Sequence, residues 1–130
     1  MEYAYNQAKS LLHQAQSPNG FLAATNDVDN YKRIWARDGV ICSLAGLLDG
    51  DKTLVKTMKA TLETLARHQH ELGNIPSNVD VKTDEVSFGG LAGRVDTLAW
   101  FVIGVCQYAH FTEDIEFFKT HKIAIDKCLQ

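Results

Sequence analysis

Apolar residues recur every three or four positions near the start of the chain. Residues 3–16 carry one apolar stripe, which consists of Ala4, Ala8, Leu11, Leu12 and Ala15. This spacing is that of an amphipathic helix, and the proline and glycine of "SPNG" directly after it break helical structure. The pattern therefore predicts an outer helix over residues 3–16.

Two later segments are apolar on almost every side of a helical projection. "GVICSLAGLL" begins just after Asp38, and "TLAWFVIGVCQYAHF" begins just after Asp96. A helix that is apolar all round is buried rather than amphipathic. We therefore predict two inner helices, one starting near Asp38 and one starting at Asp96.

Amphipathic segments follow each of these inner helices. Asp51 is placed to cap a helix, and the apolar face of that helix consists of Leu54, Val55, Met58, Leu62, Leu65 and Ala66. Thr112 is a second candidate cap, before the amphipathic segment "EDIEFFKTHKIAIDKCLQ". The pattern of this segment allows either a continuous helix or one interrupted near His121. Both segments are predicted to be outer helices.

The connections between these helices differ in length. Long connections lead into the two inner helices, whereas the short ones "DGD" and "TED" leave them. Loops longer than about 12 residues are usually functional or disordered, and these two contain apolar and aromatic residues that disordered linkers avoid. We expect both long loops to be ordered, to gather at one end of the structure and to form a functional site there.

Charged residues stand where each long loop meets its inner helix. Asp38 and Asp96 are each closely preceded by an arginine, in "ARDG" and "GRVD". The simplest interpretation is that each aspartate is an N-cap, a role worth about 1 kcal/mol. A functional role is the alternative, because aromatic residues lie close by in the sequence.

Those aromatic residues suit a sugar ligand. Tyr31 and Trp35 precede Asp38, and Trp100 and Phe101 follow Asp96. A sugar stacks its C–H faces on aromatic rings while its hydroxyls bond to carboxylates and guanidinium groups. Core packing is an equal alternative for Trp100, and it is the favoured interpretation for Phe101.

The composition is that of one folded domain. The chain has 130 residues, 45% of them hydrophobic, and a formal charge of −3 without any run of lysine or arginine. We therefore expect neither nucleic acid nor an anionic membrane as a partner. The first residues lack the pattern of a leader, and no window approaches the roughly 20 apolar residues of a membrane span, so we expect a cytoplasmic protein.

Cysteine and histidine give no metal pattern. Cys42, Cys106 and Cys128 lack a CxxC spacing and have apolar neighbours, which favours reduced, buried thiols over disulfides or zinc. His68 and His70 do not share a helix face, and the charges of "DVKTDE" are expected on a solvated loop tip, where a substrate contact remains open. No cofactor and no metal is implied.

Three segments carry a family resemblance. They are "GFLAATNDVDNYKRIWARDGVICSLAGL", with its W-x-R-D core, then "GNIPSN", then "RVDTLAWFVIGV". In this order they resemble the loops and inner-helix starts of six-hairpin (α/α)6 glycoside hydrolases, especially glucoamylases and the amylo-α-1,6-glucosidase domain of glycogen debranching enzymes. In the second segment Ser77 stands between the proline and asparagine that are adjacent in that group. The resemblance covers about residues 20–111.

The resemblance implies an all-α fold that is the N-terminal part of an (α/α)6 toroid. Twelve helices form that double ring, and the chain has room for about five helices of ordinary length. The family's general base comes from the later half. We therefore expect residues 1–130 to be a single partial catalytic domain of a longer glycogen-debranching-like enzyme, with the remaining half of the domain as its partner.

The resemblance also implies residue roles for an inverting hydrolase of α-glucosides, which binds an oligo- or polysaccharide. Asp96 is the general acid, and the substrate-binding residues are Tyr31, Trp35, Arg37, Asp38, Asn78 and Trp100. Arg37 and Asp38 would bind sugar hydroxyls in the innermost subsite, with Trp35 and Tyr31 as its wall. The alternative class is a non-catalytic helical carbohydrate-binding or interaction module that keeps these loops and lacks the base.

Overall fold

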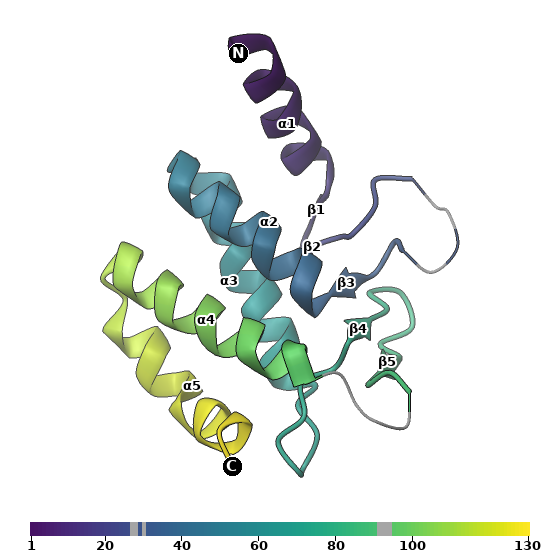
Figure 1. Ribbon diagram of the computed structural model, residues 1–130, viewed down its shortest axis with the longest axis vertical. Coiled ribbons are helices and arrows are strands. Elements are labelled where there is room, and N and C mark those ends of the chain that lie inside the picture. Colours follow the sequence, from purple (N-terminus) through teal and green to yellow (C-terminus); the bar gives the residue numbers. More distant parts are fainter. Residues whose placement is uncertain (27–28, 30, 91–94) are drawn as a thin grey trace.

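A computed structural model describes residues 1–26, 29, 31–90 and 95–130 (Figure 1). The helices in these ranges are α1 (Glu2–Gln14), α2 (Ala36–Asp49), α3 (Lys52–Arg67), α4 (Val95–Thr112) and α5 (Ile115–Cys128). Short strands lie between them: β1 (Gln16–Ser17), β2 (Gly20–Phe21), β3 (Ile34–Trp35), β4 (Asn78–Val79) and β5 (Val86–Ser87). The mainly helical class predicted from the sequence is confirmed.

The strands were not predicted, and they make two small antiparallel sheets. β1 pairs with β2 in a hairpin after α1, and β4 lies between β3 and β5 in a sheet of three strands. Each strand is two residues long, which is too short for the alternation of polar and apolar residues that marks a strand in a sequence. The all-α description therefore needs this correction.

The helices α2 and α4 lie side by side and run in the same direction (Figure 1). α3 packs against α2, and α5 packs against α4, so that each makes a hairpin with the helix before it. The main core lies among these four helices and includes Val40, Met58, Leu62, Leu65, Phe101, Val105, Phe117 and Ile125. Phe101 has no exposed surface, which confirms its predicted core role.

The helix α3 has the predicted cap and the predicted buried face. The Asp51 carboxylate accepts hydrogen bonds from the backbone N–H groups of Thr53 and Leu54, at 2.9 and 3.4 Å. Hydrogen bonds from the side chain and the backbone of Thr53 are the main cause that holds the pKa of Asp51 far below its usual range. Leu54, Met58, Leu62 and Leu65 have no exposed surface.

The start of α5 differs from the prediction. Asp114 is the N-cap, and its side chain accepts a hydrogen bond from Phe117 N at 2.9 Å, whereas Thr112 is the last residue of α4. The helix also runs through His121 without an interruption. The His121 ring is buried, and its centroid lies 4.2 Å from that of Phe117. The histidine therefore belongs to the apolar face, which explains the apparent break in the pattern.

The inner helices are covered on one side only. α3 and α5 cover one face of the α2–α4 pair, while Ile41, Leu48, Ile103 and Phe111 keep exposed fractions of 47, 77, 41 and 54%. Both helices are expected to be buried rather than amphipathic, but in the described chain each is buried on one side and exposes apolar residues on the other. None of the helices described here is both long enough and apolar enough to cross a membrane.

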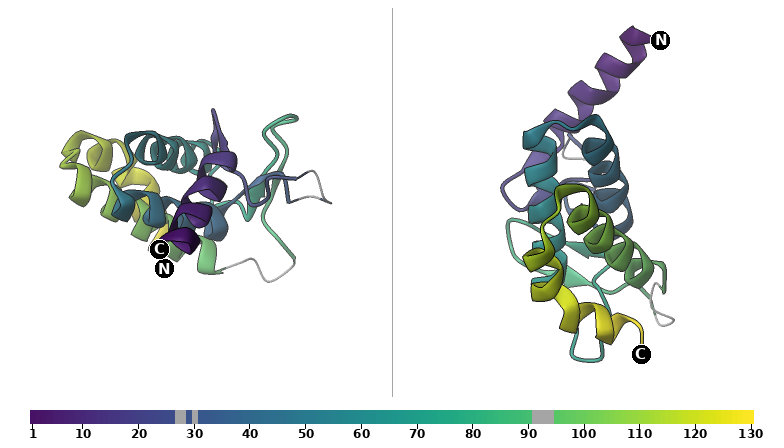
Figure 2. Two further views of the ribbon diagram at one scale, coloured as in Figure 1. Left: turned by 90° about the horizontal axis from the view of Figure 1, so that it is seen from above. Right: turned by 90° about the vertical axis from the view of Figure 1, so that its left-hand side faces the viewer.

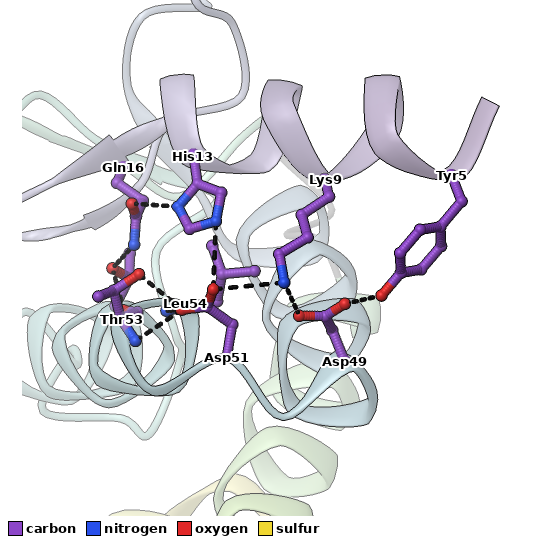
Figure 3. A network of polar contacts seen from close by, with 9 residues as sticks. Tyr5, Lys9, His13, Gln16, Asp49, Asp51, Thr53 and Leu54 are labelled. Atoms are coloured by element: carbon purple, nitrogen blue, oxygen red, sulfur yellow. Dashed lines mark hydrogen bonds and ion pairs between the residues drawn. The ribbon is translucent and has the colours of Figure 1, made fainter. Parts of the chain in front are cut away.

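The helix α1 extends away from the other helices, and the two chain ends lie at opposite ends of the molecule (Figures 1 and 2). None of its residues is buried, although Ala15, just after it, is. Polar contacts attach α1 to the turn between α2 and α3 (Figure 3). Tyr5 and Lys9 bond to Asp49, and His13 Nε2 lies 3.3 Å from Asp51 Oδ2.

Candidate active site

The two long loops meet in the three-stranded sheet. Ile34 and Trp35 of β3 pair with Val79 and Asn78 of β4, and the first residue of α2, Ala36, donates its N–H to Ser77 O at 2.9 Å. The prediction that both loops gather at one end is confirmed by this pairing. The sheet sits where α2 and α4 begin (Figure 1).

Arg33 joins the loops through its side chain. Its Nη1 lies 3.2 Å from Asn78 Oδ1, and its Nη2 lies 3.2 Å from Asp80 Oδ2. The backbone N–H of Lys82, followed by that of Thr83 and the charge of Arg33, lowers the pKa of Asp80. Arg33 was not singled out in the sequence, because nothing in "KRIWARD" separates it from other surface cations.

The structure places the predicted substrate-binding residue Asn78 inside the protein. Its side chain is only 3% exposed, and its amide oxygen accepts the bond from Arg33. Its neighbour Ser77 is also 3% exposed, and Ser77 Oγ has no hydrogen-bond partner among the described residues. In this structure Asn78 therefore contributes to holding the loops together.

Arg37 and Asp96 make an ion pair across the two inner-helix starts. Arg37 Nη1 lies 3.1 Å from Asp96 Oδ2, and the side chains are 51% and 38% exposed. The two residues are 59 positions apart in the sequence. Two of the predicted site residues are thus brought into direct contact at the surface.

Neither candidate aspartate is an N-cap. α2 begins at Ala36 after Trp35, which makes no side-chain cap, so Asp38 lies within the first turn. Asp96 also lies within the first turn of its helix, α4. A carboxylate in a first turn interacts favourably with the positive end of the helix dipole. Asp38 is exposed, and its charge adds to burial in raising the pKa of Cys42.

The aromatic candidates fall into two environments. The rings of Tyr31 and Trp35 are stacked, with centroids 5.7 Å apart and planes inclined by 22°, and Tyr31 is 51% exposed. Trp100 lies one turn after Asp96 on α4, is partly buried and packs against the main core. The structure therefore gives Trp100 a packing contact, while the Tyr31–Trp35 stack offers an aromatic surface.

Surface pockets described in the structure lie away from these residues. A pocket of about 410 Å³ beside α1 is lined by Leu11, Leu12, Ala15, Leu22, Ala23, Ala24, Thr25, Asn26 and Cys42. Another of about 380 Å³ lies between α4 and the end of α5. Neither contains a predicted site residue. Arg37, Asp96 and Tyr31 lie instead on an open surface.

Within the described ranges, no group of three or more His, Cys, Asp or Glu residues is arranged to hold a metal ion. All three cysteines are free thiols. Cys42 and Cys128 are partly buried, but Cys106 is exposed on the uncovered face of α4. The expectation that every cysteine is buried is therefore wrong for Cys106. Burial raises the pKa of Cys42 and of Cys128.

The sequence was compared with models of known protein families and with curated proteins, and neither comparison found a match.

Proposed function

We propose that this chain is part of an inverting glycoside hydrolase that acts on α-glucosidic linkages. The observation that carries the proposal is the 3.1 Å contact between Arg37 and Asp96 at the joint start of α2 and α4. The stacked Tyr31 and Trp35 rings belong to the same loop end. This combination of a carboxylate, a guanidinium group and an aromatic surface suits a sugar.

Asp96 is assigned the role of general acid. Hydrolysis of a glycoside needs a proton on the leaving oxygen and a water activated by a second carboxylate, with the two carboxyls about 6.5–9.5 Å apart in inverting enzymes. An ion pair requires a charged carboxylate, whereas a general acid must start with a proton. The Arg37–Asp96 bond would therefore be given up when the sugar binds, and Arg37 would turn to a sugar hydroxyl.

The remaining subsite roles are proposed from the family resemblance. Asp38 and Arg37 bind hydroxyls, the Tyr31–Trp35 stack faces the sugar ring, and Trp100 supports the acid from within α4. Sugar sites are concave, whereas Arg37 and Asp96 lie on an open surface. The proposal therefore includes further helices of a toroid that close the site and supply the general base.

The test is the Asp96→Asn variant of the natural protein that contains this chain. On an ordinary α-glucoside, whose alkoxide leaving group needs a proton, the rate should fall by about 10²–10⁴-fold. On α-glucosyl fluoride the loss should be much smaller, because the fluoride ion leaves without being protonated. Asp126→Asn, an exposed change on α5, is the matched control. Equal losses on both substrates would remove Asp96 from the mechanism.

A non-catalytic carbohydrate-binding module is the second candidate. It is favoured by the ion pair itself, because Asp96 bonded to Arg37 is a binding group rather than a proton donor. In that case maltose and isomaltose would change the fluorescence of Trp35 without being hydrolysed, and Asp96→Asn would weaken binding. Hydrolysis by the natural protein excludes this candidate.

A further inference from the structure

The ring of His68 lies between two oxygen atoms at the end of α3. His68 Nδ1 is 2.8 Å from the backbone carbonyl oxygen of Thr64, and His68 Nε2 is 2.9 Å from Asp84 Oδ1. The histidine side chain is 11% exposed, and that of Asp84 is 72% exposed. The contact joins α3 to the hairpin between β4 and β5, 16 residues later in the chain.

Both contacts together require one proton more than a neutral imidazole carries. A carbonyl oxygen only accepts hydrogen bonds, so Nδ1 must carry a hydrogen atom. A carboxylate oxygen also only accepts, so Nε2 must carry one as well. A neutral ring has one N–H, and with that hydrogen on Nδ1 the lone pair of Nε2 would face the carboxylate at 2.9 Å. Most of the Asp84 side chain lies in water, so we assign the additional proton to the ring.

Two backbone hydrogen bonds close the hairpin tip on itself. Asp84 N donates to Asp80 O, and Asp80 N donates to Glu85 O, each at 2.9 Å, so these bonds stay within the hairpin. The backbone of Asp84 has φ of 62°, in the left-handed region that costs a non-glycine residue roughly 1 kcal/mol. The base of the hairpin is fixed by the β3–β4 pairing.

Other charged groups near the ring are exposed. Asp84 contacts His68 from the hairpin, and the charged side chains beside Asp84, Lys82 and Glu85, are exposed. On the segment of His68 itself, the neighbouring charged or titratable residues are Arg67, His70 and Glu71. The helix α5 also lies close, because Gln69 Nε2 donates a hydrogen bond to Ala124 O, and its charged residues at this end are Asp126 and Lys127. Water and salt screen exposed charges at such positions strongly. The two direct contacts are therefore the strongest polar interactions of the His68 ring.

We propose that His68 and Asp84 form a pH-sensitive latch, which holds the β4–β5 hairpin against the end of α3 while the ring carries both protons. Imidazole changes its charge between about pH 5 and 8. The latch is closed at the acidic end of this range, and it opens as the pH rises and Nε2 loses its hydrogen. β4 carries Asn78 and pairs with β3, so the latch acts on a hairpin that belongs to the three-stranded sheet. The inference does not depend on the proposed function.

The test is hydrogen exchange of a peptide covering residues 80–87, measured by mass spectrometry at about pH 5.5 and about pH 8, on either side of the imidazole titration. Protection factors, corrected for the intrinsic pH dependence of exchange, remove the chemical effect of pH. In the natural sequence we expect protection to fall by about 3- to 5-fold at the higher pH, as for loss of an exposed ion pair. Unchanged protection would overturn the latch.

Two variants make the test specific. In Asp84→Asn the side-chain amide can donate to the lone pair of a neutral Nε2, and asparagine tolerates the left-handed backbone. This variant should stay protected at both pH values. His68→Phe keeps a ring without nitrogen atoms and should be poorly protected at both. If either variant shows the same pH-dependent fall as the natural sequence, the proposal is wrong.

Discussion

The helices α3 and α1 are both amphipathic in sequence, but the protein uses them differently. α3 buries Met58, Leu62 and Leu65 completely in the main core, and it buries Leu54 completely beside Phe21 of β2. α1 buries none of its residues: Leu12 packs only partly against a small cluster of Ala15, Phe21 and Leu54. Tyr5, Lys9 and His13 add polar contacts (Figure 3). An apolar stripe thus predicts that a helix forms, whereas the burial of that stripe depends on which other elements pack against the helix.

The comparison is tested most strongly by removing one leucine side chain from each helix. Leu62 has no exposed surface, so Leu62→Ala should lower the free energy of unfolding by about 2–5 kcal/mol. Leu11 is 55% exposed, so Leu11→Ala should change it by less than about 0.5 kcal/mol. Urea denaturation of both variants measures the difference. Similar losses would mean that Leu11 is buried in solution.

Sequence periodicity predicted the helices well because the apolar face of a helix is formed by residues that are close together in the sequence. The Asp51 cap, the buried face of α3 and the two segments that became α2 and α4 depend on residues close together in the chain. The Asp114 cap was missed because Thr112, two residues earlier, is also a capping residue type, although a weaker one than aspartate. Local patterns therefore predict the existence of a helix better than they predict its first residue.

The site was harder to predict because its contacts join distant residues. Arg37 and Asp96 were each proposed from their own surroundings, but their ion pair depends on how the loops fold together. Arg33 with Asn78, and His68 with Asp84, have no periodic signal at all. Short strands such as β3 and β4 leave no alternation to detect. These features needed the three-dimensional structure.

A second prediction concerns the close approach of α2 and α3. A Cβ atom on Gly46 would lie 2.7 Å from Leu54 Cβ, which is closer than two such carbon atoms pack. Gly46→Ala should therefore cost about 1–3 kcal/mol, although alanine normally favours a helix over glycine. Ala45→Ser, one position earlier on the exposed side of α2, is the control, with an expected loss of about 0.5 kcal/mol. A more stable Gly46→Ala variant would show that the helices can separate without cost.

The smallest expected effect is in the polar attachment of α1. Lys9 Nζ lies 2.7 Å from Asp49 Oδ2 and 3.4 Å from Asp51 Oδ2. Lys9→Met keeps an unbranched side chain of nearly the same length and removes its charge, so the backbone amides of α1 should exchange faster with solvent. Since partly exposed ion pairs contribute little, global unfolding should change by less than about 1 kcal/mol.

The matched control for Lys9→Met is Lys56→Met, on the exposed side of α3, which should leave hydrogen exchange in α1 unchanged. Salt at about 1 M should reproduce part of the Lys9→Met effect in the natural sequence, because the Debye length then falls to about 3 Å. If Lys9→Met instead destabilised the whole protein as much as Leu62→Ala, α1 would unfold together with the core. The distinction between a helix held mainly by buried apolar side chains and one held largely by polar contacts would then not apply here.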